Sequence, residues 1–121
     1  MPDVDALECF DNPQPDRDYL IEHVADEFTS LCPKTGHPDF GSVIIQFSPD
    51  QSCVELKSLK LYLQSFRNEG IFYEAVTNRI RDDLADLMNP RWLSVTTQWR
   101  SRGGIRSTIT ATHGSDPDLM P

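Results

Sequence analysis

The stretch Gly-Ser-Val-Ile-Ile-Gln-Phe-Ser, residues 41–48, alternates between two kinds of side chain. Val43, Ile45 and Phe47 share one face of an extended chain, and Gln46 lies on the other face. This period of two predicts a β-strand that buries one face in a core. A strand needs hydrogen-bonding neighbours, and segments on both sides of this one supply them.

Three further segments are compatible with strands. Residues 20–30 fit a strand that carries many acids, and a loop with two prolines and a glycine separates them from residues 41–48. Residues 93–99 and 105–111 alternate in the same way on either side of a turn at Arg102-Gly103-Gly104. The sequence therefore predicts two pairs of antiparallel strands.

Two helices are predicted between the strand pairs. Residues 58–68 show helical spacing, with Ser58 as the N-cap and Gly70 as the stop signal. The second helix, from about residue 72 to 88, has a buried stripe of Phe72, Val76, Ile80, Leu84 and Leu87. The order β-β-α-α-β-β predicts an α+β domain with both helices on one face of an antiparallel sheet.

The length of 121 residues fits one domain. We expect residues 1–18 to be a mobile acidic lead-in, residues 19–113 the domain, and residues 114–121 a tail. No apolar run is long enough to cross a membrane, and the acidic N-terminus is unlike a secretory signal. Three sparse cysteines fit a cytoplasmic protein with free thiols.

The net charge of −8 is unevenly distributed. Residues 1–20 contain six acids and one arginine, which gives −5, whereas residues 57–106 contain nine basic and five acidic residues, which gives +4. An anionic ligand is therefore compatible with the second half of the chain. Four strands also leave open sheet edges, which predicts a homo-oligomer that closes several copies into one barrel.

The loop Leu-Cys-Pro-Lys-Thr-Gly-His-Pro-Asp, residues 31–39, brings together a thiol, a lysine, an imidazole and a carboxylate. Cys32 is a candidate nucleophile, because nearby positive charge favours its thiolate, and Asp39 is a candidate proton donor across the turn. A buried, inert cysteine is the alternative. A zinc site from Cys32, His37, His23 and Cys53 lacks any standard ligand spacing, so we expect no metal. Cys9 is interpreted as incidental and Cys53 as a packing residue.

A second candidate site lies where the first helix starts. Lys57 and Lys60 are three residues apart, so they share a helical face near free N–H groups that favour an anion. A solvated charged face is the alternative. Arg102 is a possible third cation, and Glu74, at the start of the second helix, is either a favourable helix-start acid or a ligand for a guanine-like edge.

Four segments together resemble a known family. They are EFTSLCPKTGHPDF (residues 27–40), ELKSLKLY (55–62), SFRN (65–68) and RGG (102–104). Their order and spacing are similar to those of the NADPH-dependent 7-cyano-7-deazaguanine reductases, the nitrile reductases of queuosine biosynthesis, which have the tunnelling fold. The short chain resembles the single-module branch, whose subunits form facing rings with active sites between neighbours.

The resemblance implies a mechanism and a set of site residues. Cys32 would form a covalent thioimide with the nitrile, Asp39 would be the general acid, and two NADPH molecules would supply hydrides. Lys57, Lys60 and Arg102 would bind the NADPH phosphates. The substrate would contact Val54, Glu55, Leu56, Tyr73 and Glu74, of which Glu74 would hold the base. Tyr73 stands where many members have histidine.

Three other functions remain open from the sequence. A non-catalytic ring that binds a purine or a pterin would use Glu74 and leave Cys32 structural. An archaeosine-type amidinotransferase shares the fold and the cysteine but needs no NADPH. A zinc-dependent cyclohydrolase would need a metal-ligand set. We expect no direct nucleic-acid binding and no membrane partner.

Overall fold

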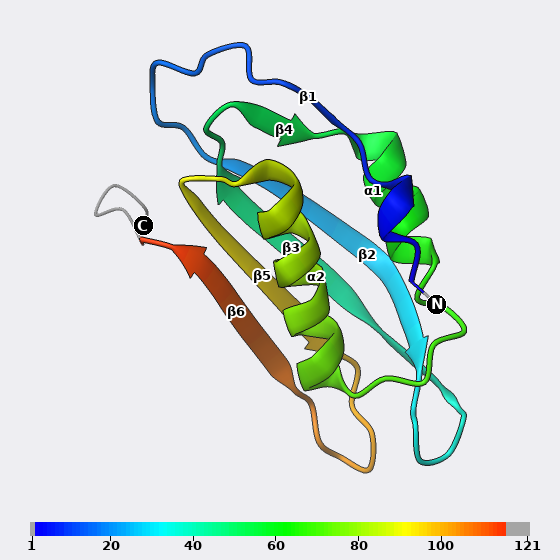
Figure 1. Cartoon of the computed structure of the whole chain (residues 1–121). Coiled ribbons are helices and arrows are strands. Elements are labelled where there is room, and N and C mark those ends of the chain that lie inside the picture. The colour runs from blue at the N-terminus through cyan, green and yellow to red at the C-terminus, as the bar shows by residue number, and fades with distance from the viewer. Residues whose placement is uncertain (1, 116–121) are drawn as a thin grey trace.

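The computed structural model describes residues 2–115. Its main sheet has four antiparallel strands in the spatial order β2-β3-β5-β6 (Figure 1). Both helices pack into one core with this sheet, α1 beside β2 and α2 across β5 and β6 (Figure 1). The predicted α+β fold is confirmed. The bounds are β2 Ile21–Leu31, β3 Pro38–Ser48, α1 Leu56–Gln64, α2 Tyr73–Met88, β5 Trp92–Trp99 and β6 Thr108–Gly114.

The helix-covered face of the sheet holds the apolar residues of the alternating strands. Val43, Ile45 and Phe47 of β3 are completely buried, as are Leu93 and Val95 of β5. Burying each such side chain contributes about 1.5–3 kcal/mol. The acids of β2 are accommodated because its side chains alternate between the core and solvent, with a register shift between residues 25 and 28.

Helix α2 matches its predicted bounds closely. Val76, Ile80 and Leu84 are completely buried, and Asn89 ends the helix in the left-handed conformation with φ of 45°. Phe72 was expected in the buried stripe, and this prediction is wrong. It is 53% exposed, because it precedes the first helical turn and lies at the end of the core.

Helix α1 starts and ends earlier than the predicted range of 58–68. Glu55 is its N-cap, and its carboxylate accepts hydrogen bonds from the N–H groups of Lys57 at 2.7 Å and Ser58 at 2.8 Å. The prediction of Ser58 as the cap is therefore wrong, as is the prediction of free N–H groups at this helix start. Ser58 instead uses its hydroxyl to accept the N–H of Glu8 at 3.0 Å.

Part of the N-terminal segment is folded against the domain. It contains a short helix, η1 (Val4–Ala6), and a strand, β1 (Cys9–Asp11), which pairs with β4 (Ser52–Val54). Between them Leu7 is only 8% exposed and belongs to the core. The segment expected as a mobile lead-in thus contains regular structure and one core residue.

The strand ends also differ from the sequence-based bounds. Strand β3 begins at Pro38, so Asp39 lies in a strand and not in the loop. Ile105 was expected within the last strand, but β6 begins only at Thr108 and Ile105 is 71% exposed. The predicted tail lies outside the described residues from 116 onward. No helix within residues 2–115 is long and apolar enough to cross a membrane.

Candidate active site

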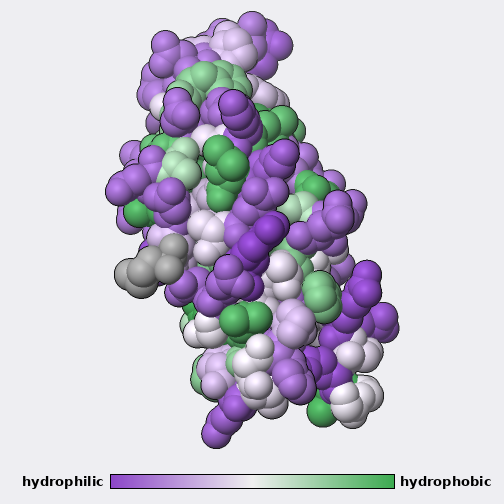
Figure 2. Space-filling model, turned by 90° about the vertical axis from the view of Figure 1, so that its right-hand side faces the viewer, coloured by the Kyte–Doolittle hydropathy of each residue, from purple (hydrophilic) through white to green (hydrophobic). Residues whose placement is uncertain are grey.

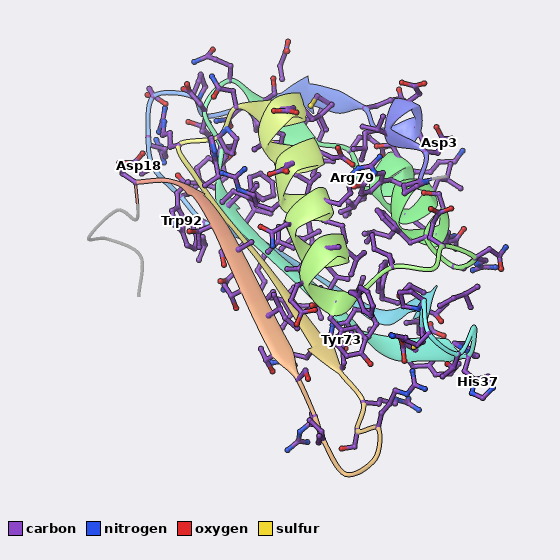
Figure 3. The ribbon with its side chains drawn as sticks, turned by 60° about the horizontal axis from the view of Figure 1, so that its bottom comes forward. Asp3, Asp18, His37, Tyr73, Arg79 and Trp92 are labelled. Atoms are coloured by element: carbon purple, nitrogen blue, oxygen red, sulfur yellow. The ribbon has the colours of Figure 1, made fainter. Side chains whose placement is uncertain are left out.

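The predicted nucleophile lies in a short, hydrogen-bonded loop between β2 and β3. Its ends are closed by the Cys32 N–H, which donates to the His37 carbonyl, and by the Gly36 N–H, which donates to the Cys32 carbonyl, both at 2.8 Å. Gly36 has φ of 73°, a conformation that glycine adopts without strain. Figure 3 shows His37 at the exposed tip of this hairpin. The loop therefore fixes Cys32 at one end of the sheet.

The environment of Cys32 favours its thiolate. The pKa of Cys32 is lowered to about 7, first by a hydrogen bond from the Thr35 hydroxyl and then by the N–H groups of Thr35 and Lys34. Arg102 contributes a further hydrogen bond. The Thr35 hydroxyl also accepts the His37 N–H at 3.2 Å, which leaves its proton for the sulfur. Because the thiolate is the nucleophilic form, this loop activates Cys32.

Asp39, the second residue of β3, lies near Cys32. Its side chain is 3% exposed and accepts a hydrogen bond from Arg102 Nη1 at 2.5 Å. The main-chain carbonyl of Asp39 accepts the Thr29 hydroxyl at 2.7 Å, which attaches this point of β3 to β2. A buried carboxylate needs such a charged partner, and Arg102 provides it.

The segment before α2 completes the wall around Cys32. The Leu31 N–H donates to the Glu69 carbonyl at 2.8 Å, and the Ile71 N–H donates to the Leu31 carbonyl at 3.0 Å. This bridge brings the start of α2 next to the thiol loop. The result is a pocket of about 210 Å³ lined by Cys32, Pro33, Asp39, Ile71, Phe72, Tyr73, Glu74 and Arg102. Below it is called the thiol pocket.

Tyr73 and Glu74, in the first turn of α2, both line the thiol pocket. Figure 3 shows Tyr73 at this end of the helix. The Tyr73 ring stacks on Trp99, and its hydroxyl lies close enough to Asp39 for that carboxylate to affect the pKa of the phenol. Burial raises the pKa of Tyr73, and the negative charge of Asp39 adds to this effect. The phenol is therefore a proton donor towards Asp39. Glu74 is exposed, so its carboxylate is available to a ligand.

The other predicted substrate residues lie at the far end of the sheet. Val54, Glu55 and Leu56 line a separate pocket of about 270 Å³ together with Ile21 and Phe47. Ile21 pairs with Phe47 at one end of the β2–β3 ladder, whereas Leu31 pairs with Pro38 at the thiol end. At about 3.3 Å per residue, β2 separates the two ends by roughly 30 Å. One chain does not bring the two groups together.

Lys57 and Lys60 lie on the exposed side of α1, away from the thiol pocket. Within residues 2–115, neither side chain forms an ion pair closer than 4 Å. Figure 2 shows this side of the molecule as mostly hydrophilic, with small, separate hydrophobic patches. The N–H groups of Lys57 and Ser58 are occupied by Glu55, so any anion here would be bound by the lysine side chains.

The predicted site residues thus fall into two groups. The thiol pocket unites Cys32, Asp39, Tyr73, Glu74 and Arg102, while Val54, Glu55, Leu56, Lys57 and Lys60 surround the start of α1. Sequence reasoning missed the thiolate contact of Thr35 and the exposed pocket position of Phe72. Their signals were a hydroxyl three residues after the cysteine and an aromatic residue just before a helix. No cluster that could hold a metal ion is found among residues 2–115.

Comparisons with known proteins agree on one family. The profile of the family described as QueF-like protein matches residues 38–118. The chain is 62% identical to an NADPH-dependent 7-cyano-7-deazaguanine reductase of Pelodictyon phaeoclathratiforme, over 90% of this chain and 94% of that relative. A relative of the same name from Rhodopirellula baltica is 57% identical, over 90% of each chain. One from Chlorobaculum tepidum is 54% identical, over 94% of this chain and 97% of the relative.

A solved structure supports the fold independently. The apo form of the archaeosine synthase QueF-Like superposes with a TM-score of 0.75 at 20% identity, over 81% of this chain and 96% of that one. At this identity the similarity concerns the fold alone. The family profile and the identities above 50% over most of the sequence show that this chain belongs to the QueF-like protein family, alongside relatives named NADPH-dependent 7-cyano-7-deazaguanine reductases.

Proposed function

We propose that this protein reduces the nitrile of 7-cyano-7-deazaguanine to the aminomethyl group of 7-aminomethyl-7-deazaguanine, with NADPH, in queuosine biosynthesis. The thiol pocket carries the proposal, because it unites an activated cysteine with a buried acid. The names of the relatives at 54–62% identity support the substrate and the cofactor. The three free cysteines are compatible with a cytoplasmic location.

The first chemical step uses residues of the thiol pocket. The Cys32 thiolate attacks the electrophilic carbon of the nitrile, and the nitrogen takes one proton, which gives a covalent thioimide. Asp39 delivers this proton, and the phenol of Tyr73 lies next to Asp39. Cys32 gives its proton to the Asp39 carboxylate as the thiol ionises, and Asp39 then passes that proton to the nitrile nitrogen, so the step balances without an external acid. Covalent capture also keeps the partly reduced imine on the protein.

NADPH fits the lysine face of α1 better than the helix end itself. Lys57 and Lys60 are exposed and three residues apart, which suits the phosphates of a dinucleotide. Bound there, NADPH would supply the hydrides, of which a nitrile-to-amine reduction needs two. Arg102 was expected in the same phosphate-binding set. In this chain it pairs with Asp39 and its side chain is 40% exposed, so it would join the two lysines where a second copy brings its α1 to the thiol pocket.

The substrate base would be held by Glu74, whose exposed carboxylate accepts N–H groups from a guanine-like edge. Val54, Glu55 and Leu56 belong to the same proposed pocket but lie roughly 30 Å away along β2 in one chain. A second copy that places its α1 start against the thiol pocket would complete the site. We therefore propose a homo-oligomer of facing rings with active sites between subunits.

The test mixes protein, NADPH and 7-cyano-7-deazaguanine and follows the absorbance of the reduced cofactor. We expect oxidation of two NADPH for each nitrile, no oxidation with Cys32→Ala, and normal oxidation with the control Cys9→Ser. Mass spectrometry of the protein with substrate alone should show an adduct on Cys32. NADPH oxidation that persists in Cys32→Ala would contradict the thioimide mechanism. Substrate binding without any adduct or turnover would favour the non-catalytic ring.

A further inference from the structure

Arg102 connects the two reactive groups of the thiol pocket. Its Nη1 donates to the Asp39 carboxylate at 2.5 Å, and its guanidinium faces the same pocket as Cys32, where it helps to lower the pKa of the thiol. These partners are 63 and 70 residues away in the sequence. All three residues line one pocket. A single cation therefore faces two groups that are both negative when ionised.

The hairpin between β5 and β6 holds Arg102 in this place. Arg102 and Ile105 exchange two backbone hydrogen bonds, at 2.9 and 3.0 Å, around Gly103 and Gly104. Both glycines have positive φ, 58° and 81°, as a tight two-residue hairpin turn requires. The Arg100 N–H also donates to the Phe40 carbonyl at 3.0 Å, which attaches the hairpin to β3 beside Asp39. The backbone of this hairpin thus positions Arg102 at the thiol pocket.

The chemistry of the guanidinium suits this position. It presents five N–H donors in a plane, so it can bind a carboxylate with one edge and a sulfur with another. A lysine ammonium carries the charge without this fixed fork. Asp39 is 3% exposed, so its charge has little water around it and depends on this partner. The Arg102 side chain is 40% exposed, so the part of the guanidinium that does not face Asp39 stays accessible.

We propose that Arg102 is a positioning residue of the thiol pocket, which holds the Asp39 carboxylate and the Cys32 sulfur on one guanidinium. The effect of this residue on catalysis rests on the proposed function, whereas its contacts in the pocket do not depend on it. In this role Arg102 increases the reactivity of Cys32 before any ligand binds, and it orients the Asp39 carboxylate. The Thr35 hydroxyl and the loop N–H groups contribute more to the thiolate, so Arg102 adds a partial effect.

The first test measures alkylation of Cys32 by iodoacetamide against pH, without substrate or cofactor, by mass spectrometry of the Cys32 peptide. Arg102→Gln should slow the reaction at pH 6 by about threefold, because less of the Cys32 thiol is ionised without the guanidinium. The alkylation rate of Arg102→Lys should lie between those of wild type and Arg102→Gln. Arg106→Gln, which changes an exposed arginine of the same hairpin, should react at the wild-type rate. An Arg102→Gln profile that coincides with wild type would overturn the proposal.

The second test addresses Asp39 through thermal unfolding. Arg102→Gln leaves a buried carboxylate unpaired and should lower the Tm by about 3–5 °C. Adding Asp39→Asn removes that charge and should recover part of the loss. A double variant no more stable than Arg102→Gln alone would contradict the ion-pair role.

The Michaelis constant for NADPH separates this inference from the phosphate-binding role. A rise for Arg102→Gln with an unchanged alkylation profile would show a phosphate ligand and refute the proposal. Neither the alkylation nor the unfolding readout needs turnover. If wild type fails to reduce the nitrile while both readouts shift as expected, the proposed function falls and the positioning role stands.

Discussion

Tyr73 and Trp99 lie face to face, with ring centroids 4.1 Å apart and planes within 8° of parallel. Trp99 is 1% exposed and also contacts Phe28 edge-on, so it forms a fixed support. The stack orients the Tyr73 hydroxyl towards Asp39. A core aromatic pair therefore determines the position of a polar group in the thiol pocket.

Separate variants distinguish the ring of Tyr73 from its hydroxyl. Tyr73→Phe keeps the stack and should leave stability within about 0.5 kcal/mol of wild type, while kcat falls about fivefold to tenfold with the lost hydrogen bond. Tyr73→Ala removes the stack as well and should lower the free energy of unfolding by about 1–3 kcal/mol. Urea unfolding and turnover together check this. Equal kcat in Tyr73→Phe and wild type would show that the Tyr73 hydroxyl does not contribute to the reaction rate.

The pH dependence of alkylation should separate two cysteines of one chain. The pKa of Cys32 is lowered to about 7, whereas burial raises the pKa of the Cys9 thiol. Thiolate forms as the pH rises through the pKa, so Cys32 should reach half its maximal rate near pH 7. Cys9 should react appreciably only at more alkaline pH, although its residue is exposed. Peptide-resolved mass spectrometry gives both rates, and overlapping profiles would contradict the activation of Cys32.

Leu7 should stabilise the domain even though it lies in the acidic N-terminal segment. Because its side chain is in the core, Leu7→Ala should lower the free energy of unfolding by about 2–3 kcal/mol. Val4→Ala, three residues earlier and 42% exposed, should change it by less than about 0.5 kcal/mol. Deleting residues 1–18 should also destabilise the protein, although no proposed site residue lies there. Equal urea midpoints for the two variants would show that Leu7 is not packed.

Glu55 should stabilise α1 in a pH-dependent way. Hydrogen bonds from the N–H groups of Lys57 and Ser58 lower the pKa of Glu55, so folding favours its carboxylate. The stability difference between wild type and Glu55→Gln is then present near neutral pH. It disappears as the pH falls through the lowered pKa of Glu55. Urea unfolding across this acid range tests the effect, with the exposed Asp86→Asn as control. A difference that persists unchanged in acid would exclude the carboxylate cap.

The lysine face of α1 should affect the cofactor and not the thiol. Lys57→Ala and Lys60→Ala should each raise the Michaelis constant for NADPH about fivefold, for roughly 1 kcal/mol per exposed charge contact. The alkylation profile of Cys32 should stay unchanged, since neither lysine lines the thiol pocket. Arg17→Ala, an exposed cation in the N-terminal segment, is the matched control. Unchanged constants for both lysine variants would remove the proposed phosphate contacts.

The elements that the sequence predicted well are those with a local signal. Alternation in residues 93–99 and the stripe of Val76, Ile80 and Leu84 report directly which face is buried. The β1–β4 pair had no such signal, because two three-residue strands separated by 40 residues show no period. The cap of α1 was misplaced because serine is the commoner N-cap, while the longer Glu55 side chain reaches two N–H groups.

The candidate site was predicted unevenly for a similar reason. Cys32 and Asp39 stand close in sequence, and the turn between them made their meeting foreseeable. The Arg102–Asp39 ion pair joins positions 63 residues apart, and only the hairpin geometry reveals it. Phe72 was assigned to the core because its spacing matched the helix stripe. Its position before the first turn, which no periodicity encodes, places it at the pocket instead.

Cys32 is partly exposed and its pKa is lowered to about 7, which makes the protein chemically vulnerable. Peroxide reacts with thiolates for the same reason that a nitrile carbon does, and it converts them first to sulfenic acid and then to irreversible acids. The thiol pocket thus exposes its most reactive atom to damage whenever no ligand covers it. Preparations handled without reductant should lose activity through this one atom, and bound substrate should protect it.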